Sequence, residues 1–150
     1  MKPESKEDLL KIASAIAEKT AGLVERTVGR PLPISYLTIS THHPHEYERF
    51  IKLATELGQK FEANNGFKFA LHEPLQTKGS AVECIRIHKP DVYRSQLGCA
   101  DYVVEDYIAF KKDALPRYPD NLRVIKRTEY EMLEFFDFDN NDVLAYIVSK

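Results

Sequence analysis

The segment EYERFIK, residues 46–52, recurs in altered form sixty residues later as DYIAFKK, residues 106–112. An acidic residue, a tyrosine, a phenylalanine and a lysine keep the same spacing in both segments. Both have the apolar spacing of an amphipathic helix. The same offset places Leu37 on Leu97 in the apolar segments that precede them. Because the pattern around the two segments recurs in step with these letters, we predict two similar modules.

Short segments of alternating apolar and polar residues predict strands around both helices. The first module is expected to contain a strand at 34–40, a helix at 45–58 that ends at Gly58, and strands at 66–72 and 82–88. The second is expected to contain a strand at 97–104, a helix at about 105–115, and strands at 121–127, 130–136 and 142–148. The order is β-α-β-β followed by β-α-β-β-β, which predicts an α+β fold with modules at 34–90 and 97–148.

A further helix is predicted from Ser5 to about Val28, ahead of the two modules. Its apolar residues form one stripe: Leu9, Ile12, Ala13, Ile16, Ala17, Val24 and Val28. Ser5 and Asp8 have the spacing of a capping box, and Gly29 suits the left-handed residue that ends a helix. The helix, within residues 1–30, either covers the domain or mediates dimerisation, and the sequence leaves both open.

Length and composition favour a single domain over residues 1–150. The chain is 43% hydrophobic and carries a formal net charge of −2, which gives no electrostatic reason to expect nucleic acid or a membrane as partner. No apolar run reaches the ~18 residues of a spanning helix, and the start of the chain lacks the apolar centre of a signal peptide. We therefore expect a cytoplasmic protein. Cys84 and Cys99 have neither a zinc spacing nor a disulfide framework and are expected to be reduced thiols.

The stretch THHPHEYERF, residues 41–50, gathers three of the five histidines. A metal site and a helix start both explain it, and we favour the helix start. Pro44 suits the first helical position, Glu46 suits the first turn, and adjacent histidines in extended chain point to opposite sides. We expect His42, His43 and His45 to bind no metal together.

Strand alternation places charged and polar side chains opposite the apolar face of the predicted sheet. Residues two apart share a face, and the face opposite the apolar one is expected to carry Tyr36, Lys68, His72, Arg86, His88 and Arg123. On a concave sheet these groups would converge and could hold a small anion. A solvated outer face would give the same alternation.

Two stretches carry resemblances to known families. FFDFDNNDVLAY (135–146) is similar to the closing hairpin of the vicinal oxygen chelate superfamily, which includes glyoxalases and extradiol dioxygenases, and its turn would contain Asp137, Asp139 and Asn141. NGFKFALHEPLQ (65–76), with VECIRIHKP (82–90), is similar to the YecM family of bacterial proteins. The resemblance implies an α+β fold of paired βαβββ-type modules that form a curved mixed sheet cup, with an extra N-terminal helix.

The metal ligands of that superfamily do not carry over to this sequence. Their positions would fall at Tyr36, at Arg86 or His88, near Gly98 or Cys99, and at about Ala145. Of the residues at the first, second and fourth positions, only His88 could bind a metal. A divalent metal in the cup would need another set, such as His72, His88, Cys99 and Glu134, and we assign no metal ligand.

The resemblance implies a glyoxalase-like cup that binds a small organic molecule, which we expect to be anionic. By analogy with the fold, its activity would be that of a lyase or an isomerase. Arg86 and Arg123 would hold the anion, with Tyr36, Lys68 and His72 as further substrate-binding residues. His88 or Glu134 would move a proton. The sequence leaves open whether the protein is an enzyme, a non-catalytic ligand-binding or sequestering protein, or a homodimeric structural module.

Overall fold

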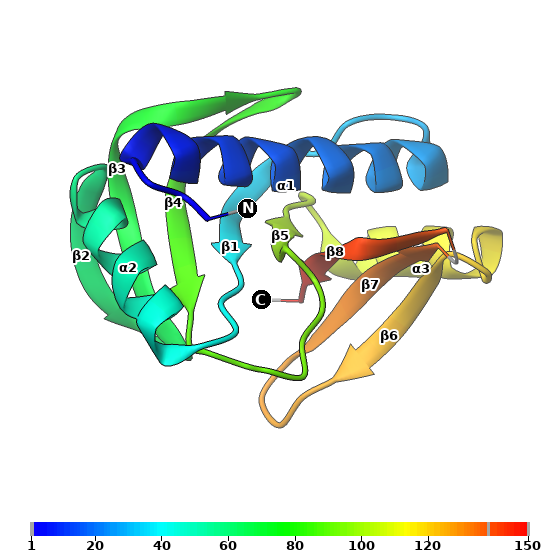
Figure 1. Ribbon diagram of the computed structural model, residues 1–150. Helices are drawn as coiled ribbons and strands as arrows, with labels where there is room; N and C mark the ends of the chain where they lie inside the picture. Colours follow the sequence, from blue (N-terminus) through cyan, green and yellow to red (C-terminus); the bar gives the residue numbers. More distant parts are fainter. Residues whose placement is uncertain (1, 138, 150) are drawn as a thin grey trace.

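In a computed structural model, the chain is described over residues 2–137 and 139–149 (Figure 1). Within these residues it forms three helices and eight strands: α1 (Lys6–Val28), β1 (Ile34–Ile39), α2 (Pro44–Thr55), β2 (Gly58–Ala63), β3 (Gly66–Thr77), β4 (Ser80–His88), β5 (Gly98–Tyr102), α3 (Tyr107–Arg117), β6 (Leu122–Lys126), β7 (Glu131–Asp137) and β8 (Asn140–Val148). None of the helices in the described ranges is both long and apolar enough to cross a membrane.

The strands form one mixed sheet whose order is symmetric about its centre. The order is β2-β3-β4-β1-β5-β8-β7-β6. β1 pairs in parallel with β4, β5 pairs in parallel with β8, and the remaining pairs are antiparallel. Each half therefore has the connectivity βαβββ, and the two halves meet where β1 pairs with β5. The predicted α+β class with an additional N-terminal helix is confirmed.

The first module contains a strand, β2, that the sequence did not predict. α2 ends at Thr55, and Gly58 opens β2 instead of ending the helix. A Cβ atom at Gly58 would lie 2.1 Å from the carbonyl oxygen of Ala70, so the close approach of β3 requires a glycine there. Because β2 is an edge strand with mostly exposed residues, its sequence GQKFEA lacks the alternation of a half-buried strand.

The residues that match in sequence between α2 and α3 do not occupy the same positions within the two helices. His43 caps α2 and Asp106 caps α3, so the helix starts are separated by three residues more than the letters indicate. Tyr47 is thus the fourth residue of its helix, whereas Tyr107 is the first. A shift of about one helical turn preserves an amphipathic pattern. The matching residues therefore lie about one turn apart in the two helices, although the order of elements does recur. Superposition of the two modules remains a prediction.

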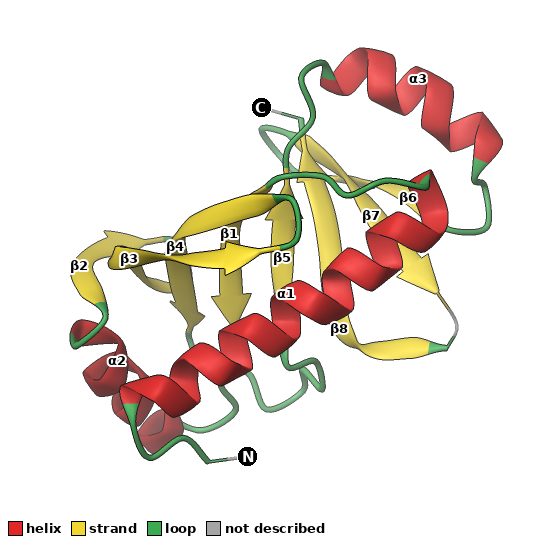
Figure 2. Cartoon of the chain, turned by 90° about the horizontal axis from the view of Figure 1, so that it is seen from above, coloured by secondary structure: helices red, strands yellow, loops and turns green. Residues whose placement is uncertain are grey.

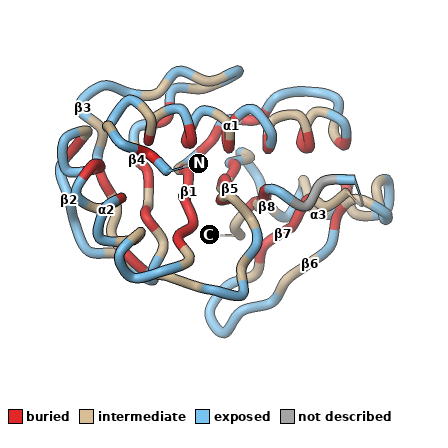
Figure 3. Tube along the Cα trace, viewed as in Figure 1, coloured by how far each residue is buried: buried red, intermediate tan, exposed pale blue. Residues whose placement is uncertain are grey.

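α1 lies across one face of the sheet and reaches both modules (Figure 2). Residues of the central strands that are buried on this side include Leu37, Ile39, Ile85, Ile87, Ala100, Ala145 and Ile147. Figure 3 shows that the buried part of α1 is the side turned toward the sheet. The apolar stripe predicted for this helix therefore contributes to the main core.

The predicted ends of α1 are confirmed by their hydrogen bonds. The Ser5 hydroxyl accepts from the backbone N–H of Asp8 at 3.2 Å. Gly29 has a φ of 78°, and its N–H donates to the Glu25 carbonyl at 2.8 Å. Each bond satisfies a backbone group that a helix end leaves without a helical partner.

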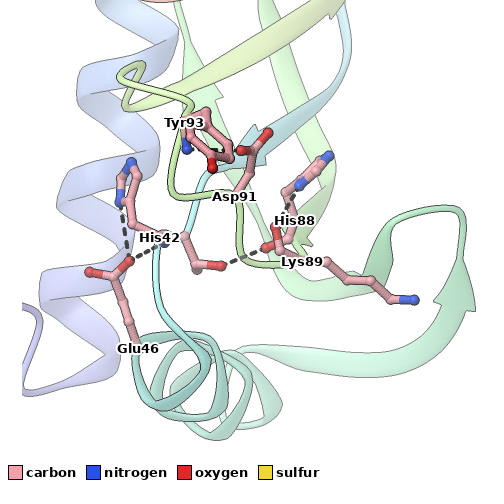
Figure 4. A network of polar contacts seen from close by, with 7 residues as sticks. His42, Glu46, His88, Lys89, Asp91 and Tyr93 are labelled. Carbon is pink, nitrogen blue, oxygen red and sulfur yellow. Dashed lines mark hydrogen bonds and ion pairs between the residues drawn. The ribbon is translucent and has the colours of Figure 1, made fainter.

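The histidine-rich stretch begins α2, as predicted. His43 is the N-cap and Pro44 the first helical residue. The backbone N–H of His42 donates to the Glu46 carboxylate at 2.7 Å, and the His42 imidazole lies 3.2 Å from the same oxygen (Figure 4). The His43 and His45 rings stack with their centroids 5.9 Å apart. Glu46 thus closes the helix start by reaching back to the residue before the cap.

The closing hairpin is tighter than the resemblance implied. Asp137 is the last residue of β7 and pairs with Asn140, while Asn141 lies within β8. Asp139 is in the turn, where its N–H donates to the Asp137 side chain at 3.0 Å. Residue 138 of this hairpin lies outside the described residues.

Candidate functional site

The face of the sheet turned away from α1 carries the candidate site. A Cβ atom at Gly98 would lie 2.6 Å from the Ile16 side chain of α1, so this side of β5 faces the helix. Because neighbouring residues of a strand point to opposite faces, Cys99 and Asp101 face away from α1.

The register of four strands brings polar residues together on this face. Tyr36 of β1 lies opposite Asp101 of β5. Arg86 of β4 lies between Lys68 of β3 and Thr38 of β1. The central strands of both modules therefore contribute to one cluster.

The cluster forms one wall of an open cavity of about 1260 Å³. The cavity-lining residues from β1, β3, β4 and β5 include Tyr36, Lys68, Arg86, His88, Cys99 and Asp101. Four of the predicted binding or catalytic residues are thus gathered at one place: Tyr36, Lys68, Arg86 and His88.

Lys68 and Arg86 are two neighbouring cations on this wall. The Lys68 ammonium lies 3.9 Å from the centroid of the Tyr36 ring, and the Arg86 guanidinium carbon lies 5.7 Å from it. Arg86 donates to the Thr38 hydroxyl and to the Asn64 carbonyl, both at 3.2 Å. Within the described part of the chain, neither cation has a carboxylate within ion-pair distance. The wall therefore presents two positive charges, with Asp101 as the acidic side chain near them, and hydrogen bonds hold the Arg86 guanidinium in place.

Asp101 is a site residue that the sequence analysis did not select. Burial raises the pKa of its carboxyl, while a hydrogen bond from Tyr36 and the charges of Arg86 and Lys68 act in the opposite direction. Burial also raises the pKa of Tyr36, so its hydroxyl stays neutral and can donate. The signal was an acidic residue inside the otherwise uncharged strand GCADY, on the face opposite Gly98 and Tyr102.

His88 stands at the end of β4 with one ring nitrogen engaged. Its Nδ1 lies 2.7 Å from the Lys89 carbonyl oxygen (Figure 4). A carbonyl only accepts, so this contact requires a proton on Nδ1 and leaves Nε2 as an acceptor in the neutral ring. Burial lowers the pKa of His88, and the charges of Arg86 and Arg94 lower it further. At neutral pH the imidazole is therefore uncharged and can accept a hydrogen bond.

Cys99 and Tyr146 are neutral members of the same face. Burial raises the pKa of the Cys99 thiol to about 11, so it is not a thiolate at neutral pH and is a poor nucleophile. Tyr146 lies beside Asp101 in the β5–β8 register, and burial raises the pKa of its hydroxyl. These groups can donate hydrogen bonds but carry no charge.

His72 does not join the other predicted residues. It is exposed on β3, in the part where the pairing with β4 shifts register between Ala70 and Leu75. It is not among the residues that line the cavity. The assumed alternation failed here because the shift interrupts the regular register with β4.

Arg123 and Glu134 form an ion pair with each other instead of lining the cavity. They are cross-strand neighbours in β6 and β7. The Arg123 guanidinium also lies over the Phe136 ring, 5.2 Å from its centroid. Glu134 is only 3% exposed, and its charge is compensated by Arg123. The pair links β6 to β7 and is not part of the candidate site.

Two of the positions expected for metal ligands do not face the cavity. Gly98 and Ala145 are buried on the α1 side of their strands, so the residues nearest to them in sequence that line the cavity are Cys99 and Tyr146. Within the described ranges, no three histidine, cysteine or acidic side chains are grouped closely enough to hold a metal. The proposed set of His72, His88, Cys99 and Glu134 is therefore not brought together.

Comparisons with known proteins give a likeness of fold. No family model matches the chain, and no curated protein matches its sequence. A solved structure described as "Structural Genomics, Protein EC4020" is similar over 96% of this chain and 87% of its own, with a TM-score of 0.69 and 16% identity. A methylmalonyl-CoA epimerase in complex with methylmalonyl-CoA is similar over 78% of this chain and 93% of its own, with a TM-score of 0.46 and 14% identity. The first likeness supports the fold alone, and the second is too distant to support any argument.

Proposed function

We propose that the protein binds a small organic anion in the cavity. The observation that carries this proposal is the pair of neighbouring cations on the cavity wall, Lys68 and Arg86, neither of which has a carboxylate of the described residues within ion-pair distance. A guanidinium and an ammonium at one place recognise a carboxylate or a phosphate through charge-assisted hydrogen bonds. Arg86 is already oriented by Thr38 and Asn64, which lowers the entropic cost of ordering it when the ligand binds.

The same charges favour an anion over a metal ion at this wall. Asp101 is the acidic side chain among the lining residues that come from the sheet. A divalent cation beside it would also meet the positive charges of Lys68 and Arg86. The superfamily's metal chemistry is therefore not part of this proposal.

Loss of one cation tests the proposal directly. We expect Arg86→Ala to weaken sulfate or small-carboxylate binding by about tenfold or more, since hydrogen bonds to charged groups contribute about 1.5–3 kcal/mol. Titration calorimetry measures the affinity, and thermal denaturation measures the stability of each variant. Arg117→Ala is the matched control, because it removes the same charge from an exposed ion pair with Asp113 on α3. Equal binding by the parent and Arg86→Ala would disprove the proposed anion site.

A second candidate function is proton transfer next to a carbonyl, as in lyases and isomerases. The specific observation is Asp101, whose carboxyl has a raised pKa and lies opposite Tyr36 in the β1–β5 register, beside the two cations. A carboxylate there would accept a proton from a carbon acid, and Tyr36 would donate a hydrogen bond to the developing oxyanion.

This activity predicts exchange of carbon-bound hydrogen with solvent. In D₂O, the parent protein should speed the loss of the proton signal next to the carbonyl of a 2-oxo or 3-oxo acid. Asp101→Asn should abolish this acceleration, because an amide cannot accept the proton, while binding of the acid persists. If Asp101→Asn exchanges protons as fast as the parent, Asp101 is not the base.

A further inference from the structure

The cavity extends well beyond the two cations. Its volume of about 1260 Å³ exceeds the roughly 300–1,000 Å³ of pockets that hold drug-sized ligands. A sulfate or an acetate at Lys68 and Arg86 would occupy a small part of it. The remaining wall therefore contributes to the choice of ligand.

That remaining wall is built by different segments and has a different chemistry. It contains the connection from β5 to α3, the first turn of α3, and the turn between β6 and β7. The apolar or aromatic residues that line it include Val103, Val104, Tyr107, Ile108, Tyr130, Met132 and Val148. One end of the cavity is thus cationic, and the other, here called the apolar end, gathers most of the apolar side chains that line the cavity.

Three of these side chains are large, apolar and unusually exposed. Ile108 is 77% exposed, and Val103 and Tyr130 are each 45% exposed. Single exposed apolar residues are normal on protein surfaces. Here, residues from separate segments converge on one cavity that also carries a charged site, and such convergence marks a binding surface.

The charges at the apolar end do not favour a second anionic group. Arg127 lines this end together with Glu105, Asp106 and Glu129, so its formal charges are mixed and negative on balance. The Lys111 ammonium, which could add positive charge, is paired with Glu131 at 2.6 Å. An uncharged part of a ligand fits this end better than a second carboxylate or phosphate.

We infer that the ligand is amphiphilic, with an anionic headgroup at Lys68 and Arg86 and an apolar body against Val103, Ile108 and Tyr130. This inference rests on the proposed function, because it assumes that the cations hold the headgroup. A monocarboxylate or a phosphate monoester with an alkyl or aryl chain has the required chemistry. The apolar body would cover side chains that are otherwise in contact with water.

Chain length provides the test. Titration calorimetry with butanoate, hexanoate and octanoate should show affinity rising about threefold to fourfold for each added CH₂ group, as expected from about 0.8 kcal/mol per buried CH₂. Ile108→Ser and Tyr130→Ser should flatten this rise while leaving the affinity for butanoate, or for sulfate as competitor, close to that of the parent. Val92→Ser is the matched control, because Val92 is 62% exposed but does not line the cavity.

The outcomes separate the two proposals. If Arg86→Ala lowers all affinities equally and keeps the rise with length, both proposals hold. If the three acids bind equally and Arg86→Ala still weakens them, the anion site stands and the amphiphilic ligand is wrong. If no acid and no sulfate binds, the proposed function itself fails. A parent that sediments as a dimer and that Ile108→Ser dissociates, with the rise with chain length unchanged, would show that the apolar end is a subunit interface. That result would overturn the inference.

Discussion

Asp101 and Tyr36 show how one environment acts differently on two neighbouring side chains. They face each other across the β1–β5 pairing, and burial raises the pKa of both. For the tyrosine, this removes any tendency to ionise near neutral pH. For the aspartic acid, burial moves the ionisation of the carboxyl to higher pH, closer to neutrality. Asp101 is therefore the residue through which pH should act on the site.

We predict that sulfate affinity falls as the pH rises through the raised pKa of Asp101. Below that pKa the carboxyl is neutral, and above it the carboxylate repels the anion beside Lys68 and Arg86. Sulfate stays a dianion from pH 4 to 8, so its own charge does not change. In Asp101→Asn this dependence should be lost, and at pH 8 the variant should bind sulfate more tightly than the parent, on the order of tenfold, given the size of such charge interactions. Calorimetry across this range measures both effects.

His88 must be separated from Asp101 in that experiment. Protonation of His88 below its lowered pKa would also strengthen the proposed anion binding at acid pH. Tyr36, Cys99 and Tyr146 stay neutral because burial raises the pKa of each. His88→Gln removes the imidazole contribution alone. If the pH dependence persists in Asp101→Asn and vanishes in His88→Gln, the histidine is responsible and the role of Asp101 is disproved.

At the scale of elements, local signals gave the helix ends, and pairing partners decided the strands. The capping residues Ser5 and Gly29 of α1 and the start of α2 at Pro44 were readable because each satisfies groups within a few residues of itself. β2 was missed because it forms by pairing with the backbone of β3. A pattern of neighbouring residues carries no information about that partner. Gly58 looked like a helix end, but it is a glycine because β3 passes so close to it.

At the scale of the whole molecule, the two modules are joined by the β1–β5 pairing and by α1. β1 and β5 pair over most of their length, and α1 contacts strands of both halves. Gly98 lies where these two connections meet. A Cβ atom there would approach the Thr38 carbonyl oxygen of β1 to 2.1 Å as well as Ile16 of α1.

We predict that Gly98→Ala lowers the free energy of unfolding by about 1–3 kcal/mol, the usual cost of overpacking. The methyl group would force β1 and β5 apart, and urea denaturation measures the loss. Gly22→Ala is the matched control, since it adds the same methyl group within α1, where the nearest atom is the flexible end of Arg26 at 3.3 Å. There the change should stabilise by about 0.5–1 kcal/mol, because glycine weakens a helix interior. Equal stability of the two variants would contradict a tight joint at Gly98.

The sequence by itself determined the α+β class, the N-terminal helix with its ends, and most strands, because hydrophobic periodicity and capping are local properties. It also placed Tyr36, Lys68, Arg86 and His88 on one face, since strand alternation has a fixed period of two. Only the tertiary structure decided that His72 lies outside the cavity and that Arg123 and Glu134 neutralise each other. It also brought Asp101 of the second module beside Tyr36 of the first. These outcomes depend on strand register and on pairing between strands that are distant in sequence. A register shift within a module, or a strand pair that joins the two modules, changes which side chains meet.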